Sequence, residues 1–186
     1  MMGGCRVRKL ADEDHSFTHG VPGFGFVIAR RDALETTAGR STSLSLDLYD
    51  QWQGLENGHG KWRFTSPTHV VHAFAQALVE LTAEGGVEVR HERYRSNQQR
   101  LIKRFHDAGL DAVIAPEAQS PIITAFGYPT PDFDFAAFYE DLKQEGFVIY
   151  PGKVSEVDTF RIGTIGEVYP DDVDRLADAV VAHREW

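Results

Sequence analysis

One group of residues with chemical potential is the hydroxyl-rich run FTSPT at residues 64–68. Ser66 is a good helix N-cap and Pro67 suits the first helical turn, so a helix is expected to begin here. The first backbone N–H groups of a helix are free and lie at the positive end of its dipole. With the hydroxyl of Thr65 beside them, they could cradle a phosphate. Simple capping by Ser66 is the alternative, and the residues alone leave both open.

Arg161 is a second candidate, because it stands between Phe160 and Ile162 in an apolar segment with the pattern of a strand. Alternation along a strand turns its side chain away from both neighbours. A guanidinium that points inward requires an anion, since a buried charge must be paired. Its planar fork matches the oxygens of a carboxylate or a phosphonate. The anion could belong to a ligand or to one of the 28 acidic residues, and both remain open.

Two other patterns argue against common kinds of site. His69 and His72 are three residues apart in the expected helix and could face one ligand. The zinc-protease pattern instead places its histidines four apart with a glutamate after the first, so no metal site is expected. The glycines of residues 20–25 precede an apolar run and do not open a helix, which argues against dinucleotide binding.

The elements that would position these residues follow from hydrophobic periodicity and turn residues. The expected helices cover residues 66–84, 87–108, 134–145 and 170–183. The expected strands cover residues 24–28, 111–115, 121–126, 147–150 and 159–163. The first of these strands should be buried, and residues 36–60 should form an extended, partly exposed segment with a loop. Strands that alternate with helices predict an α/β or α+β class, in which helices cover a sheet.

Composition limits the class of protein. Hydrophobic residues make up 42% and charged residues 25%, as in a globular domain. The net charge of −9 argues against a nucleic-acid partner. Arg90 and Arg93 are mixed with acidic residues, which favours a solvated helix face. Cys5 is the only cysteine, which fits a reducing compartment. No membrane span or secretory signal is evident, so a cytoplasmic location without a membrane partner is expected.

Six longer stretches carry a specific resemblance to a known family. They are residues 20–30 (GVPGFGFVIAR), 43–52 (SLSLDLYDQW), 60–71 (GKWRFTSPTHVV), 119–123 (QSPII), 146–153 (GFVIYPGK) and 160–169 (FRIGTIGEVY). Together they resemble the 2-aminoethylphosphonate–pyruvate transaminases, from Gly20 to about Asp178. The resemblance implies the C-terminal half of a fold-type-I, class-V aminotransferase that depends on pyridoxal phosphate and works as a homodimer. Such an enzyme moves the amino group of 2-aminoethylphosphonate to pyruvate, giving phosphonoacetaldehyde and alanine.

The resemblance also assigns parts and residues. Residues 1–19 match nothing, residues 20–86 correspond to a remnant of the large cofactor-binding domain, and residues 87–186 to an α/β small domain. Thr65 resembles the threonine that reaches the cofactor phosphate of the partner subunit. Arg161 resembles the arginine that holds the anionic end of the substrate. The family's Schiff-base lysine would fall at Ser16, and a serine cannot replace that amine.

Three hypotheses follow. The chain is a transaminase by family, or a non-catalytic, truncated domain that acts in dimerisation or interaction, or a class-V aminotransferase for another anionic substrate. Loss of neighbouring strands in the large domain would leave an apolar face exposed near residues 20–60. Residues 87–186, in contrast, are expected to fold alone.

Overall fold

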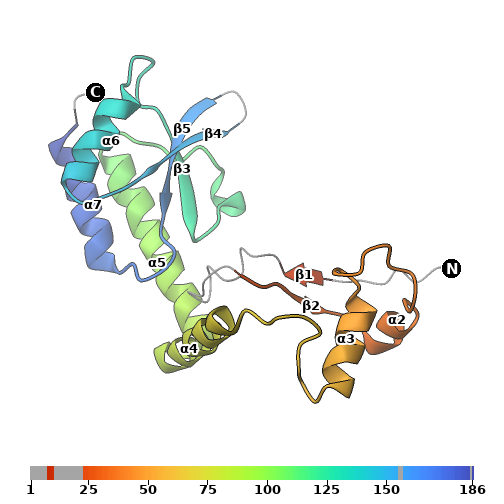
Figure 1. The fold of residues 1–186 in the computed structure, drawn as a ribbon. Coiled ribbons are helices and arrows are strands. Elements are labelled where there is room, and N and C mark those ends of the chain that lie inside the picture. Colours follow the sequence, from red (N-terminus) through yellow and green to blue (C-terminus); the bar gives the residue numbers. More distant parts are fainter. Residues whose placement is uncertain (1–7, 11–22, 155–156, 185) are drawn as a thin grey trace. The chain divides into compact units, whose positions relative to one another are not determined.

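The computed structural model describes residues 8–10, 23–154, 157–184 and 186 (Figure 1). They form two compact units, which divide between Val79 and Glu80, inside helix α4 (Thr68–Glu84). The boundary expected between residues 86 and 87 stays a prediction. Ser16 lies outside the described residues. Within the described ranges, every helix is too short or too polar to serve as a transmembrane span.

The second unit is built on a three-stranded antiparallel sheet in the order β3-β5-β4. These strands are β3 (Ile123–Gly127), β5 (Val157–Gly163) and β4 (Tyr150–Val154). The helices α5 (Gly86–Asp107), α6 (Phe135–Gln144) and α7 (Pro170–Ala182) lie on one side of the sheet (Figure 1), and the short helix η1 (Pro116–Ala118) precedes β3. The mixed α/β class predicted from the sequence is confirmed.

The inner face of this sheet packs aromatic side chains against the helices. Phe160 and Phe126 are opposite each other on β5 and β3, both are fully buried, and their ring centroids are 5.8 Å apart. The rings of Phe133, Phe135 and Phe138 surround Phe160 with centroid distances of 6.4, 6.0 and 5.6 Å. Aromatic pairs at such distances add to the gain from burial. The inner face therefore fixes the orientation of β5.

The helices of the second unit begin and end where their flanking residues predict. The Asp134 carboxylate accepts hydrogen bonds from the N–H groups of Ala136 and Ala137, at 2.9 and 3.1 Å, and so caps α6. Pro170 stands in the first turn of α7. Gly109 follows α5 with φ of +89°, a left-handed conformation that glycine adopts without strain. The expected bounds of α5, α6 and α7 are confirmed to within a residue at each end.

The structure shifts two of the expected strands. β4 begins at Tyr150, where the strand predicted over residues 147–150 was to end, and it contains Pro151. Proline lacks an N–H group, but β4 is an edge strand of the sheet, where such a residue is tolerated. The strand predicted over residues 111–115 is absent from the described sheet, and only an isolated bridge joins Ala112 to Phe126.

The first unit differs more from the expectation. β1 (Arg8–Leu10) pairs with β2 (Phe26–Ile28) in an antiparallel ribbon. Ile28 is 64% exposed, so the prediction of a buried strand there is wrong. Two helices, α2 (Arg31–Glu35) and α3 (Leu48–Asn57), were missed, and α3 lies where residues 36–60 were expected to be extended. Asp47 caps α3 by accepting a hydrogen bond from the N–H of Asp50 at 3.1 Å.

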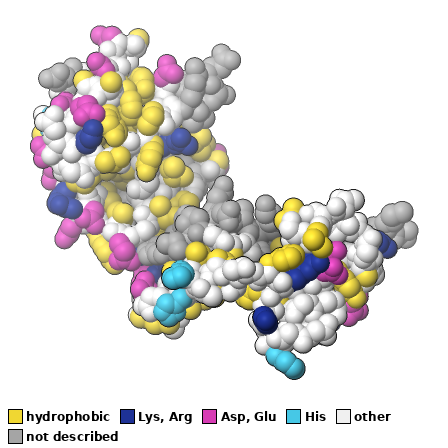
Figure 2. All heavy atoms as spheres, in the orientation of Figure 1, with side chains coloured by type: hydrophobic (Ala, Val, Ile, Leu, Met, Phe, Trp, Pro, Cys, Tyr) yellow, Lys and Arg dark blue, Asp and Glu magenta, His cyan; other side chains and the backbone are white. Residues whose placement is uncertain are grey.

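Large apolar side chains reach the surface of the first unit (Figure 2). Leu44 and Leu46 are 73% and 77% exposed, and they precede α3. The others in this unit are Val27, Ile28, Leu48, Leu55, Trp62, Phe64, Leu78 and Val79. The apolar face that the sequence predicts near residues 20–60 is therefore confirmed as an exposed surface.

Candidate functional site

Arg161 extends from the outer face of the three-stranded sheet. Its neighbours Phe160 and Ile162 are buried in the core, so alternation along β5 turns Arg161 to solvent. Because the guanidinium is exposed, it does not require an internal counter-ion. Its Nη2 donates a hydrogen bond to the carbonyl oxygen of Pro151 at 3.3 Å. Among the described residues, no carboxylate forms an ion pair with it. The remaining N–H groups of Arg161 are available to an anion.

Thr65 is exposed and lies three residues before Thr68, the first residue of α4. The helix begins two residues later than Ser66, the expected start, and the N–H of Thr68 donates to the Ser66 carbonyl at 2.9 Å. The N–H groups of His69 and Val70 find no carbonyl acceptor among the described residues. The first turn of α4 holds no acidic residue that would offset the helix dipole. This helix start therefore suits an anion.

The other residues singled out in the sequence are not brought together. His69 and His72 are both exposed on α4. In the part of the chain that the structure describes, no group of three or more His, Cys, Asp or Glu side chains could hold a metal ion. Thr65 and Arg161 belong to different units, so each is placed only within its own unit.

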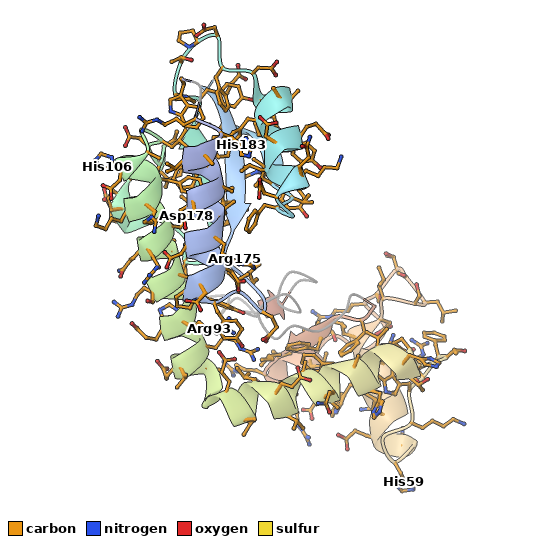
Figure 3. The ribbon with its side chains drawn as sticks, turned by 90° about the vertical axis from the view of Figure 1, so that its left-hand side faces the viewer. His59, Arg93, His106, Arg175, Asp178 and His183 are labelled. Atoms are coloured by element: carbon orange, nitrogen blue, oxygen red, sulfur yellow. The ribbon has the colours of Figure 1, made fainter. Side chains whose placement is uncertain are left out.

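The second unit holds a cluster of charges that sequence reasoning missed, with Arg90 buried and Arg93 and Glu84 partly buried. Glu84, the last residue of α4, accepts hydrogen bonds from Nε of Arg90 at 2.6 Å and from Nε of Arg93 at 2.7 Å. The Arg90 side chain is only 4% exposed and that of Arg93 11%, so the prediction of a solvated face is wrong for both. Arg93 Nη1 also donates to the carbonyl oxygens of Gly166 and Val168, at 2.8 and 2.9 Å (Figure 3).

The charges of this cluster support one another. The hydrogen bond from Arg93 lowers the pKa of the Glu84 carboxyl; burial opposes this shift, and Arg90 adds to it. Burial acts against the charge of Arg93, but the hydrogen bond and the charge of Glu84 outweigh it and raise the pKa of Arg93. The Arg93 guanidinium also lies over the ring of Tyr169, 4.9 Å from its centroid. Arg93 therefore ties the junction of α4 and α5 to the segment that follows β5.

No local pattern could have found this cluster. Its sequence signal is a glutamate at a helix end, followed by two arginines three residues apart. The carbonyl groups that Arg93 binds are 73 and 75 residues away in the chain. Only the packing of α5 against the segment before α7 brings them within reach.

The fold is that of part of a class-V aminotransferase that depends on pyridoxal phosphate. An alanine–glyoxylate aminotransferase from Nostoc matches with a TM-score of 0.73 and 21% identity, over 89% of this chain and 45% of that chain. An aspartate aminotransferase from Thermus thermophilus matches with a TM-score of 0.70 and 25% identity, over 87% of this chain and 44% of that chain. A phosphoserine aminotransferase from Trichomonas vaginalis was solved with pyridoxal phosphate bound. It matches with a TM-score of 0.70 and 22% identity, over 86% of this chain and 44% of that chain.

The sequence is similar to curated 2-aminoethylphosphonate–pyruvate transaminases. The relative from Bacillus cereus is 60% identical over 175 residues, which are 94% of this chain and 48% of the relative. The relative from Phocaeicola vulgatus is 59% identical over 161 residues, 87% of this chain and 44% of the relative. No family model matches the chain. The resemblance carried by the six stretches is thus confirmed, and the chain spans about half the length of the curated relatives it matches.

Proposed function

We propose that this chain supplies the C-terminal half of a transaminase that moves the amino group of 2-aminoethylphosphonate to pyruvate, with pyridoxal phosphate as cofactor. The products are phosphonoacetaldehyde and alanine. The observation that carries the proposal is the identity of 59–60% with relatives of that name, over 87–94% of this chain. In this proposal Thr65 binds the cofactor phosphate of the partner subunit, and Arg161 binds the anionic end of the substrate.

Thr65 and the start of α4 fit the phosphate group of the cofactor. The threonine is exposed, and the N–H groups of His69 and Val70, which bond to no carbonyl of the described residues, supply donors at the positive end of the helix dipole. When bound, pyridoxal phosphate supplies an electron sink at the carbon that carries the amino group. In the homodimer that we propose as the working assembly, Thr65 serves the cofactor site of the partner subunit.

Arg161 holds the anionic end of the substrate. Its guanidinium is exposed and uses one donor on the Pro151 carbonyl. An arginine has five N–H donors, so enough remain for a bidentate pair with a carboxylate or a phosphonate. The amino donor carries a phosphonate and pyruvate carries a carboxylate. One residue therefore serves both halves of the reaction.

The residues present do not fit the covalent attachment of the cofactor. Attachment and release require a lysine amine, and Ser16 stands at the matching position. Turnover therefore needs an amine that this segment lacks. Ser16 also favours a second candidate, a non-catalytic domain that acts in dimerisation or interaction. A class-V aminotransferase for another anionic substrate is the third, because Arg161 suits any such anion.

We further propose a cytoplasmic location and a division into residues 20–86, from the large domain, and residues 87–186, the small domain. The single cysteine supports a reducing compartment. The division is supported by the break between α4 and α5 at Gly85, whose φ is +113°.

The chain alone is expected to take up no pyridoxal phosphate covalently, because no lysine stands at position 16. The measurement is the intact mass after incubation with an equimolar amount of the cofactor and reduction with borohydride. A peptide map would show whether Lys9, seven residues before Ser16, is labelled. Stoichiometric labelling of Lys9 would contradict the expectation, since that lysine would then replace the missing amine.

Activity is expected only when an amine stands at position 16 and a front half is added to the chain. The Ser16→Lys variant, mixed with the separately produced front half of the Bacillus cereus relative, should form alanine from 2-aminoethylphosphonate and pyruvate. Adding Arg161→Ala should lower kcat/KM for both substrates by roughly 100-fold, as expected when a donor to a reacting anion is lost. The complex with Ser16 retained is the control and should be inactive. If the Ser16→Lys complex forms alanine only from other amino donors, the result would favour a class-V aminotransferase for another anionic substrate. If that complex assembles but is inactive, the result would favour a non-catalytic domain.

A further inference from the structure

Gly152 lies beside Arg161 on the outer face of the three-stranded sheet. In the register of β4 and β5, Gly152 is opposite Thr159, and Tyr150 is opposite Arg161. Opposite residues of an antiparallel pair share a face, so Gly152 and Arg161 are diagonal neighbours. A Cβ atom on Gly152 would lie 2.9 Å from Nε and 3.2 Å from Cγ of Arg161. The space that Arg161 fills is therefore the space that a side chain at position 152 would take.

An added methyl group would displace the arginine and not the backbone. Gly152 does not adopt the left-handed conformation, so the backbone accepts an alanine there. On the other side, Oγ1 of Thr159 would lie 3.2 Å from the new Cβ, and this short side chain is fully buried and cannot swing away. Arg161 is long and exposed, so its side chain gives way. Its hydrogen bond to the Pro151 carbonyl is then lost.

We propose that Gly152 is a positioning residue for Arg161. Because position 152 has no side chain, the Arg161 side chain lies beside β4, and its guanidinium is anchored on the Pro151 carbonyl. An anchored fork loses less conformational freedom when it binds a carboxylate or phosphonate. The inference rests on the proposed role of Arg161 in holding the anionic end of the substrate.

The test compares two glycines on the same face of the sheet. Gly163 also faces outward, and a Cβ there would meet only the Ile122 carbonyl oxygen, at 3.9 Å. In the whole chain without ligand, Gly152→Ala is expected to shift the Nε–H NMR resonance of Arg161, whereas Gly163→Ala leaves it in place. The Arg161→Lys variant assigns that resonance. Both alanine variants should keep the wild-type melting temperature.

The ligand arm uses 2-aminoethylphosphonate as the probe. Titration followed through the same resonance should show roughly tenfold weaker binding for Gly152→Ala, about 1.4 kcal/mol, and wild-type affinity for Gly163→Ala. An unchanged Arg161 resonance and affinity in Gly152→Ala would overturn the positioning role. If 2-aminoethylphosphonate does not shift the Arg161 resonance of the wild-type chain, the proposed role of Arg161 in binding substrate is wrong. The spectra without ligand still test whether Gly152 positions Arg161.

A double-mutant comparison covers the case in which Gly152→Ala destabilises the chain. If the clash is with the arginine side chain, the same substitution made in an Arg161→Ala background should cost little stability, because Nε and Cγ are gone. An equal loss of stability in both backgrounds would show that Thr159 or the backbone takes the strain. That result would also overturn the proposal.

Discussion

Replacing Phe160 by alanine is expected to lower the free energy of unfolding of the second unit by about 3–5 kcal/mol. The side chain is fully buried, and its ring lies 5.6 Å from that of Phe138 and 5.8 Å from that of Phe126, between centroids. β5 is the central strand of the sheet, held by β3 on one side and β4 on the other. The strand cannot move inward to fill the space, so the cavity remains and most of the contacts are lost.

Tyr150→Ala is the matched control for Phe160→Ala. It removes an aromatic ring from the neighbouring strand, but this side chain is 62% exposed and lies on the opposite face. Its cost should stay within about 1 kcal/mol. Native-state hydrogen exchange of the β5 amides measures both variants, because the slowest amides report the unfolding of a cooperative unit. A cost below about 1 kcal/mol for Phe160→Ala would mean that the ring does not hold the core together.

Local signals were sufficient for the helices of the second unit, and insufficient for α3. Asp134 and Pro170 act on the backbone groups next to them, so the sequence contains what their effect requires. The region of α3 is rich in Ser, Thr and Gly, which indicates a loop. There the guanidinium of Arg63 binds the Leu44 carbonyl and the Asp50 carboxylate, 19 and 13 residues away. Tertiary contacts of this kind override the local preference.

For the candidate site, too, the sequence predicts what depends on neighbouring residues and not what depends on tertiary packing. Alternation gave the direction of Arg161 relative to its neighbours, but which face of the sheet is buried depends on where α5, α6 and α7 pack. The arginine is exposed for that reason. Arg90 and Arg93 looked like part of a solvated face, because their partners lie at a helix junction and across the unit. The role of Thr65 came from the family resemblance, since its own surroundings suit any anion.

Glu84→Gln is expected to lower the free energy of unfolding of the second unit by about 3–5 kcal/mol, because it removes the negative charge between one buried and one mostly buried guanidinium group. Arg90 and Arg93 are 4% and 11% exposed and both donate to this carboxylate. A glutamine of the same shape keeps one acceptor oxygen and cannot balance two charges. Urea unfolding followed by circular dichroism at about pH 7 measures the loss.

The control for Glu84→Gln is Glu92→Gln, the same change in an exposed ion pair. Glu92 pairs with Arg95 on the surface of α5, where the two side chains are 60% and 52% exposed. Water and salt screen such a pair, so its loss should cost less than about 1 kcal/mol. Equal costs for the two variants would contradict the burial of the Glu84 cluster.

At acid pH, the wild-type chain and the Glu84→Gln variant should have the same free energy of unfolding. The pKa of Glu84 is lowered from its ordinary value of 4.5 by folding, so its stabilising effect is complete above that value. As the pH falls through the lower pKa of the folded state, the carboxyl is protonated and the effect is lost. The gap in unfolding free energy between the two chains should therefore be largest near neutral pH and should narrow as the pH falls below 4.5. Gly166 accepts a hydrogen bond from Arg93 through its carbonyl and donates one to the Tyr94 hydroxyl through its amide. Loss of the Glu84 charge loosens Arg93, so hydrogen exchange at the Gly166 amide should be faster in the variant. A gap that stays constant with pH would show that the carboxylate charge of Glu84 is not what holds this junction.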